Sequence, residues 1–407
     1  MPVLTARALL PALLLLTAGG APAPQCAAPK SDYLFVWASD AGAKKSDFLA
    51  VLDADPKSPA YGEVVATART GVPMTIAHHT EHQMPAGGIL FANGFGAGKT
   101  FLFDLHDPLR PSVAGSFEGA GEFMHPHSFV RTPSGTVLAT YQMRGHDNAE
   151  PGALVELSEK GAVLRVSPAA DPDAEPFIRP YSLAIVPALD RVVTTSADMH
   201  EKEVSHSVQI WRLSDLKLLK TVRLPTGTRG KEGDDPAEPR VLADGRTVIV
   251  SSFNCGLFLL HGIDGPAPSA KLIHSFSANG ICALPVVAGR YWVETDSGIP
   301  GLVSLDMTDP AHPKEVSRLE LKQGQLPHWI ALAPDGRRIV ISGGNKDLES
   351  RVMVATIDAT GKLALDQRFR DKASAGAGVS FDRATWPHGK TGRAIPHGAV
   401  FSRSCDE

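Results

Sequence analysis

The sequence predicts an all-β protein that folds as a seven-bladed β-propeller. Turns marked by glycine or aspartate recur every 44 to 55 residues, at Gly88, Gly135, Asp190, Gly245, Gly289 and Gly336. Short runs rich in valine, leucine, isoleucine and phenylalanine flank these turns, and no segment shows a sustained helical period. A repeat of this length, built from strands and tight turns, is typical of propeller blades arranged around a central channel.

The order of the strand-like runs predicts how the ring closes. Three runs, at residues 32–39, 47–55 and 62–68, precede the first repeat, whereas the last run, 397–402, has almost no chain after it. One mixed blade, with its inner strand from the C-terminus and its outer strands from the N-terminus, accounts for both observations. We therefore expect a single propeller domain over residues 32–403. Further strands are expected at 99–105, 207–213, 217–224 and 351–358, and longer loops at 142–151, 168–180, 225–237 and 369–396.

A position seven to nine residues before each turn marks the start of each inner strand. Together with the last strand, these positions hold His79, His127, Tyr181, Glu238, Cys282, His328 and His397. In a closed ring the seven residues surround one mouth of the channel. The four blades that carry the histidines are then neighbours.

Histidines that converge in a channel are typical ligands of copper or zinc, and the scarcity of carboxylates argues against magnesium or calcium. We therefore predict a metal site at His79, His127, His328 and His397, with copper as the expected ion and zinc as the alternative. His78 joins this site only if its strand is bent, because adjacent residues of a regular strand face opposite ways. The supporting residues expected are Glu81, Glu122 and Glu238 as acceptors for the ligating rings, Tyr181 and Glu238 as proton relays, and His82 and His388 as ligands of second rank.

Composition and the N-terminus bound the class of protein. The 407 residues are 43% hydrophobic and 21% charged with a net charge of −4, which predicts a soluble globular protein and argues against a nucleic-acid partner. Residues 1–20 resemble an export signal, with Arg7 before the apolar run 8–16 and small residues after it. That run is too short to span a membrane, so we expect a periplasmic protein without a membrane anchor. Nothing in the sequence specifies an oligomeric state.

Export gives the four cysteines an oxidising compartment. Cys26, Cys255, Cys282 and Cys405 allow three sets of pairs. A bridge between Cys26 and Cys405 would join the two chain ends where the ring closes, but spacing alone leaves the pairing open.

Two motifs are not assigned to catalysis. Residues 94–100 resemble a phosphate-binding loop but are one residue short of that motif, and a strand follows where a helix is required. They are better explained as a hairpin turn. Ser128 follows His127, yet the chain has no G-x-S-x-G elbow that would indicate a hydrolase.

Several segments resemble the selenium-binding protein and methanethiol oxidase family. They are Asp47–Val65, the His78-His79 pair, Pro126-His127-Ser128, the Glu-Pro-Arg stretch at 238–240, the runs at 304–316 and 332–342, and His397. The resemblance spans residues 32–402. It implies a seven-bladed propeller that holds copper through His78, His79, His127 and His397 and oxidises methanethiol to hydrogen sulfide, formaldehyde and hydrogen peroxide.

The chain also departs from that family. Gly62 replaces a cysteine linked to selenium binding, Val130 replaces a histidine, and His328 replaces a residue that is usually glutamine. Selenium binding is therefore not expected, and the substrate can differ.

Two functions follow from the sequence. The first is an exported copper-dependent oxidoreductase that oxidises a small thiol with dioxygen, as methanethiol oxidases do. The alternative is a non-catalytic propeller that binds a metal or a partner. A lactonase-like hydrolase fits less well, because it needs carboxylate and amide ligands for calcium.

Overall fold

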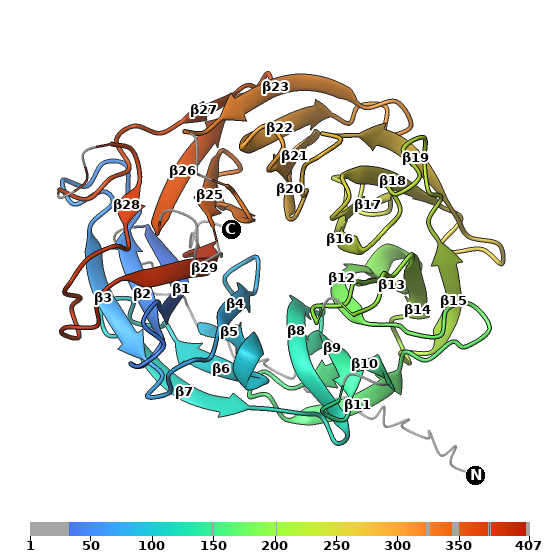
Figure 1. Cartoon of the computed structure of the whole chain (residues 1–407), viewed down its shortest axis with the longest axis horizontal. Helices are drawn as coiled ribbons and strands as arrows, with labels where there is room; N and C mark the ends of the chain where they lie inside the picture. The colour runs from blue at the N-terminus through green and yellow to red at the C-terminus, as the bar shows by residue number, and fades with distance from the viewer. Residues whose placement is uncertain are drawn as a thin grey trace, which may run out of the picture.

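Seven antiparallel sheets, six of four strands and one of five, form a closed ring in the computed structural model, which describes residues 32–403 except 148–149, 201, 323–325, 344–349, 373 and 375. Figure 1 shows the sheets as blades around a central channel, with the first strand of most blades innermost. The described residues contain two short 3₁₀ turns, η1 (Phe95–Ala97) and η2 (Pro187–Leu189), and no α-helix. The predicted seven-bladed all-β fold is confirmed.

Six blades are formed by consecutive segments of the chain. The first three comprise β4 (Ala77–Thr80), β5 (Ile89–Gly94), β6 (Lys99–Asp104) and β7 (Ser112–Phe117); β8 (Phe123–Arg131), β9 (Val137–Arg144), β10 (Glu150–Leu157) and β11 (Val163–Pro168); and β12 (Pro180–Val186), β13 (Arg191–Ser196), β14 (Ser207–Arg212) and β15 (Leu218–Arg223). The next three comprise β16 (Pro236–Val241), β17 (Val248–Ser252), β18 (Gly256–His261) and β19 (Ser269–Ser275); β20 (Pro285–Ala288), β21 (Tyr291–Asp296), β22 (Gly301–Asp306) and β23 (Lys314–Glu320); and β24 (Trp329–Leu332), β25 (Arg338–Ser342), β26 (Arg351–Ile357) and β27 (Leu363–Leu365), with β28 (Val379–Ser380) also paired to β26.

The seventh blade closes the ring from both ends of the chain. Its order is β29 (Ala394–Phe401), β1 (Tyr33–Asp40), β2 (Phe48–Asp53) and β3 (Val64–Arg69). Leu34 of β1 pairs with Phe401 of β29, and the Ser402 amide donates to the Tyr33 carbonyl at 2.7 Å. The mixed blade predicted from the sequence is therefore present.

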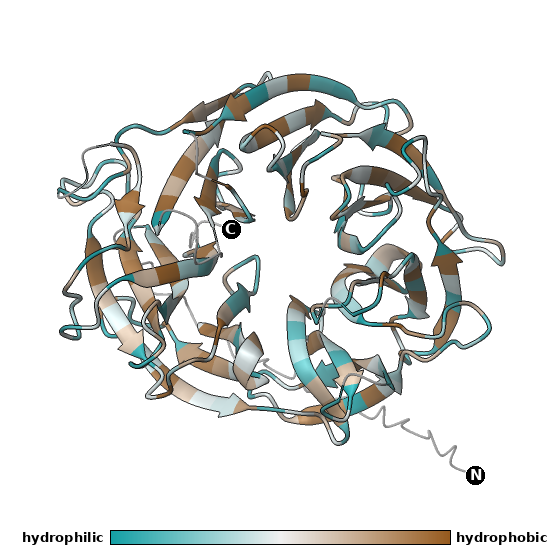
Figure 2. Ribbon diagram, viewed as in Figure 1, coloured by the Kyte–Doolittle hydropathy of each residue, from teal (hydrophilic) through white to brown (hydrophobic). Residues whose placement is uncertain are grey.

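Burial follows the distance of each strand from the channel. Inner and middle strands are buried on both faces because each blade packs between two others, as β2 shows along its whole length. Outer strands such as β7 alternate between exposed and half-buried residues. Figure 2 shows hydrophobic residues concentrated along the strands and hydrophilic residues in the connecting loops.

Indole hydrogen bonds help to hold neighbouring blades together around the site. Trp37 Nε1 donates to the Asn93 carbonyl and Trp329 Nε1 to the Ala399 carbonyl, each at 2.8 Å. Both tryptophans are fully buried. Residues 94–100 form the predicted turn, in which η1 joins β5 to β6. No helix among the described residues is long and apolar enough to cross a membrane.

Candidate metal centre

The start of β4 is bent, and the bend places two adjacent histidines in one cluster. The pairing of β4 with β5 shifts register between Ala77 and Thr80, and Ile76 just before it has a left-handed φ of 52°. The His78 and His79 rings stack with centroids 4.3 Å apart. The irregularity required for both rings to reach one ion is thus present.

A glycine on the neighbouring strand permits this bend. A Cβ on Gly398 of β29 would lie 2.6 Å from the His78 carbonyl oxygen and 2.6 Å from the Thr80 amide nitrogen. Only a residue without a side chain allows β29 to approach β4 so closely. The same approach brings His397 beside His78, with ring centroids 4.3 Å apart.

His78, His79 and His127 form a compact buried trio. One nitrogen of each ring lies within 4.8 Å of the other two, and His78 Nε2 lies 3.0 Å from His127 Nε2. His79 and His127 are fully buried, and His78 is 6% exposed. The His328 ring packs against His397 at 4.8 Å. All five histidines predicted as ligands are therefore brought together.

Hydrogen bonds orient the rings of the trio. His127 Nδ1 donates to the Tyr181 carbonyl at 2.7 Å, so its Nε2 carries the lone pair that faces His78. His79 Nδ1 lies 3.0 Å from the Ser128 hydroxyl. Two buried ring atoms, His79 Nε2 and His397 Nδ1, have no hydrogen-bond partner among the described residues.

The glutamates expected to orient these rings do not do so. Glu81 accepts from Arg131 at 2.7 Å, and Glu122 from Arg144 at 2.8 Å. Glu238 accepts from Ser182 and Arg240, each at 2.6 Å. That prediction was wrong. Arginines and a serine donate hydrogen bonds to the carboxylates, whereas a backbone carbonyl and a hydroxyl form the hydrogen bonds with the imidazole rings.

The cluster favours neutral imidazoles. Burial, followed by the charge of neighbouring histidines, lowers the pKa of His78, His79 and His397 well below the ordinary value. Burial also lowers the pKa of His127 to about 3 and that of His328 to about 4. A neutral ring keeps a lone pair, which is the form that binds a metal.

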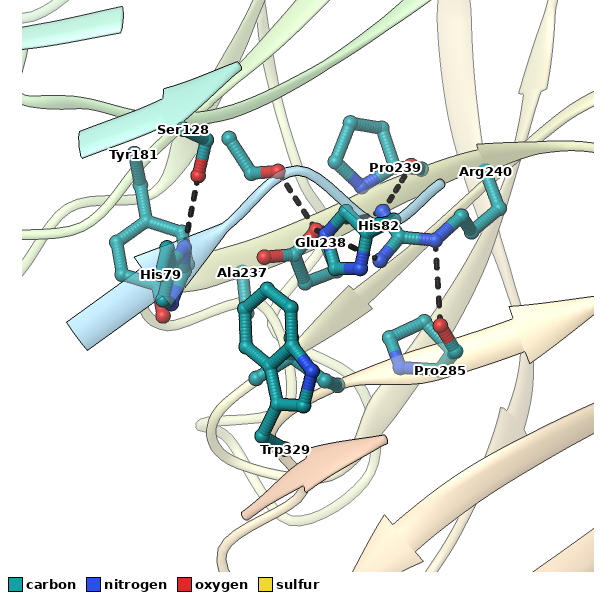
Figure 3. A network of polar contacts seen from close by, with 12 residues as sticks. His79, His82, Ser128, Tyr181, Ala237, Glu238, Pro239, Arg240, Pro285 and Trp329 are labelled. Carbon is teal, nitrogen blue, oxygen red and sulfur yellow. Dashed lines mark hydrogen bonds and ion pairs between the residues drawn. The ribbon is translucent and has the colours of Figure 1, made fainter. Parts of the chain in front are cut away.

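Figure 3 shows the two predicted proton relays, Tyr181 and Glu238, together with His79 of the trio. The Tyr181 ring packs against His127 with centroids 4.2 Å apart, and its buried hydroxyl has no partner among the described residues. Glu238 is fully buried, and burial raises the pKa of its carboxyl group against the opposing charge of Arg240. Burial and the charge of Glu238 raise the pKa of Tyr181 well above the ordinary value.

The remaining predicted positions have other roles. Cys282 forms a disulfide with Cys255, a pair that occurs in one of the three possible sets. Cys26 and Cys405 lie outside the described residues. His388 hydrogen bonds to Thr67 and Thr391 and packs on Phe48, away from the cluster, so its assignment as a second-rank ligand was wrong.

His82, predicted as a ligand of second rank, stacks on Trp329 instead, and this pair forms one boundary of the site. The rings of His82 and Trp329 are parallel within 2° at 4.6 Å, and Trp329 also meets His79 edge-on at 4.9 Å. Arg240 donates to His82 Nε2 at 3.1 Å (Figure 3). Beyond the pair lies a cavity of about 480 Å³ lined mainly by apolar residues from the far ends of the inner strands. The sequence analysis had named two residues of this layer, His82 as a ligand of second rank and Arg240 in the Glu-Pro-Arg stretch, but not Trp329.

The chain matches no protein-family model. It is 25% identical over 342 residues to a methanethiol oxidase from a Hyphomicrobium species, covering 76% of this chain and 75% of that protein. This similarity makes the methanethiol oxidase a distant relative of the chain.

Solved structures share the fold. A hypothetical selenium-binding protein from Sulfolobus tokodaii matches with a TM-score of 0.71 and 14% identity, over 93% of this chain and 95% of that one. A periplasmic gluconolactonase from Pseudomonas aeruginosa matches with a TM-score of 0.64 and 16% identity, over 92% and 100% of the two chains. At these identities the likeness establishes the propeller fold of the chain and nothing about its substrate.

Proposed function

We propose that this protein is an exported, copper-dependent oxidoreductase that oxidises a small thiol with dioxygen. The observation that carries the proposal is the buried trio of His78, His79 and His127, with His397 and His328 beside it. The distant similarity to methanethiol oxidase supports thiol oxidation as the chemistry.

The donor set fits a bound copper ion. Two neutral nitrogens 3.0 Å apart in His78 and His127 need either a shared proton or a cation between them. His79 Nε2 is buried without a hydrogen-bond partner among the described residues, which ordinarily costs free energy unless a ligand satisfies the atom. Imidazole suits copper and also zinc, so metal analysis separates the two. Bound at this cluster, copper would supply the one-electron chemistry that couples thiol oxidation to reduction of dioxygen.

The protein's own residues would handle protons and exclude water. Methanethiol, water and dioxygen would give formaldehyde, hydrogen sulfide and hydrogen peroxide. In this reaction the carbon loses two electrons and dioxygen gains them with two protons. Burial raises the pKa of Glu238, and its Oε1 has no hydrogen-bond partner among the described residues, so this carboxyl group can take part in proton transfer near the Tyr181 hydroxyl.

The cavity beyond His82 and Trp329 supports a small, apolar substrate. Its lining includes Leu183, Val286, Val287 and Leu332, which offer no hydrogen-bonding side chains. His82 of the stacked pair lines this cavity, and Trp329 contacts His79 of the trio. A methyl or ethyl thiol is a small, apolar molecule of the kind that suits such a cavity.

Export is also part of the proposal. Residues 1–20 lie outside the described residues, and the support comes from their sequence and from the Cys255–Cys282 disulfide, which suits an oxidising compartment.

Metal analysis and oxygen uptake test the proposal together. We expect protein purified from the periplasm to hold about one copper per chain and to consume oxygen when methanethiol is added. An ethyl methyl thioether should be inert, because it has no thiol proton to lose. Full copper occupancy without oxygen uptake for any small thiol would favour the non-catalytic metal-binding alternative.

A further inference from the structure

A second pair of histidines lies nearer the mouth of the channel than the trio. His125 precedes His127 by two residues on β8, and His200 lies in the loop between β13 and β14. Their ring centroids are 5.4 Å apart, with 88° between the ring planes. Because β8–β11 and β12–β15 are neighbouring blades (Figure 1), the pair joins two blades at the edge where the inner strands begin.

The backbone and hydrogen bonding of His125 hold its ring in place. The residue has a left-handed φ of 57°, which is uncommon outside glycine, asparagine and aspartate. Its Nδ1 donates to the Phe95 carbonyl at 3.1 Å, which leaves Nε2 with a free lone pair. Within the described residues, no hydrogen bond involves the ring nitrogens of His200. Both rings are half-buried and so remain accessible to ions in solution.

Phe95 of η1 separates this outer pair from the trio. Its ring lies 5.3 Å from His125 and 5.7 Å from His200 on one side. It also lies 5.7 Å from His78 and 5.7 Å from His127. One aromatic ring therefore touches both groups of histidines.

We propose that His125 and His200 form a second, exchangeable site for a borderline divalent cation such as Cu²⁺ or Zn²⁺, and that ions bind there before they reach the trio. An ion about 2 Å from one nitrogen of each ring fits between two imidazoles at this separation. Water would complete its coordination, so the site binds more weakly than the buried trio. The order of binding rests on the proposed function of the trio, whereas the second site itself does not.

The test is a titration of the metal-free full-length protein with Cu²⁺, followed by metal analysis. We expect two ions per chain in the wild type and loss of one in His200→Ala. The variant His125→Gly should also lose one ion, and glycine accepts the left-handed φ, so this variant keeps its fold. His106→Ala is the matched control, because His106 is exposed and hydrogen bonded to Asp104.

The outcomes separate the two sites. If the wild type binds a single ion that is lost in His127→Ala and kept in His200→Ala, the second site is overturned and the proposed function stands. If the single ion is instead lost in His200→Ala and kept in His127→Ala, the assignment of the trio as a metal site is overturned.

Loading kinetics test the order of binding. Trp329 lies edge-on to His79, so its fluorescence should be quenched when the trio fills. We expect quenching to slow at least fivefold in His200→Ala. Equal rates in both proteins would overturn the delivery role.

Discussion

His78 Nε2 and His127 Nε2 lie 3.0 Å apart, although the two residues belong to different blades. The contact makes the metal centre depend on how two blades pack, and it predicts that neither ring can be replaced by its neighbours. We expect His127→Ala to lose most of the copper from the trio. The Tyr181 carbonyl would then have no imidazole ring to orient. His328 belongs to another blade, so its ring cannot take the position of His127. Copper measured per folded chain checks this. Occupancy equal to that of the wild type would contradict the assignment of the trio.

Glu238 should affect turnover without affecting metal content. The change Glu238→Gln removes the ionisable carboxyl group, whose pKa burial raises, while keeping the size of the side chain. We expect oxygen uptake with methanethiol to fall by about 100-fold, as for the loss of a general acid or base, with copper unchanged.

Glu156→Gln is the matched control for that substitution. Glu156 is also a buried glutamate and accepts from a hydroxyl, that of Thr136, and from an arginine, Arg165. It lies in β10, away from the channel. A similar loss of activity in both variants would mean that Glu238 acts through stability rather than through its proton.

The repeat in the sequence predicts much of the fold because blade topology fixes where each inner strand begins. The inner strands β8, β12, β16 and β29 carry His127, Tyr181, Glu238 and His397, respectively, as the places of these residues in the sequence repeat indicated. The closing blade was also predictable, since the unpaired strands at the two ends can only complete each other.

The sequence could not predict the contacts that orient the site. The acceptor for His127 is the backbone carbonyl of Tyr181, which any residue would supply, so no glutamate was needed. His200 meets His125 through a loop whose path is set by packing rather than by strand periodicity. Cys282 occupies the same position before its turn as the site residues do. Its disulfide with Cys255 of the preceding blade leaves no thiol to bind a metal.

Gly398 should be required for the metal centre. In Gly398→Ala the new Cβ would meet the backbone of His78 and Thr80 at 2.6 Å, so β29 or β4 must move. We expect the free energy of unfolding to fall by about 1–3 kcal/mol and copper occupancy to fall with it. Gly115→Ala on β7 is the control, because its Cβ would meet nothing within 4 Å. Equal stability of the two variants would argue against the close approach of β29 to β4.

The metal-free protein should lose stability as the pH falls. Burial lowers the pKa of His328 to about 4 from an unfolded value of 6.5, so the unfolded chain binds the proton first. The stabilising contribution is complete above pH 6.5 and declines as the pH drops toward 4. For this one proton, the free energy of unfolding changes by up to about 1.4 kcal/mol per pH unit. Urea unfolding of wild type and His328→Gln at several pH values measures the difference. Parallel pH curves for the two proteins would show that His328 is not buried in its neutral form.

The Cys255–Cys282 disulfide should stabilise the side of the ring opposite the histidines. It joins residues 27 apart in the chain, before β18 and before β20, and so ties two blades together. Closing a loop of that length in the unfolded chain contributes about 3–4 kcal/mol. We expect the double variant Cys255→Ser, Cys282→Ser to lose about that much in denaturant unfolding. Phe253, whose carbonyl accepts from the Cys282 amide, packs on Tyr181 at 5.3 Å, so copper occupancy should still be measured in the variant. Copper content should remain that of the wild type, because no trio histidine contacts the disulfide in the described residues. Unchanged unfolding in the presence and absence of a dithiol reductant would show that the bridge contributes no stability.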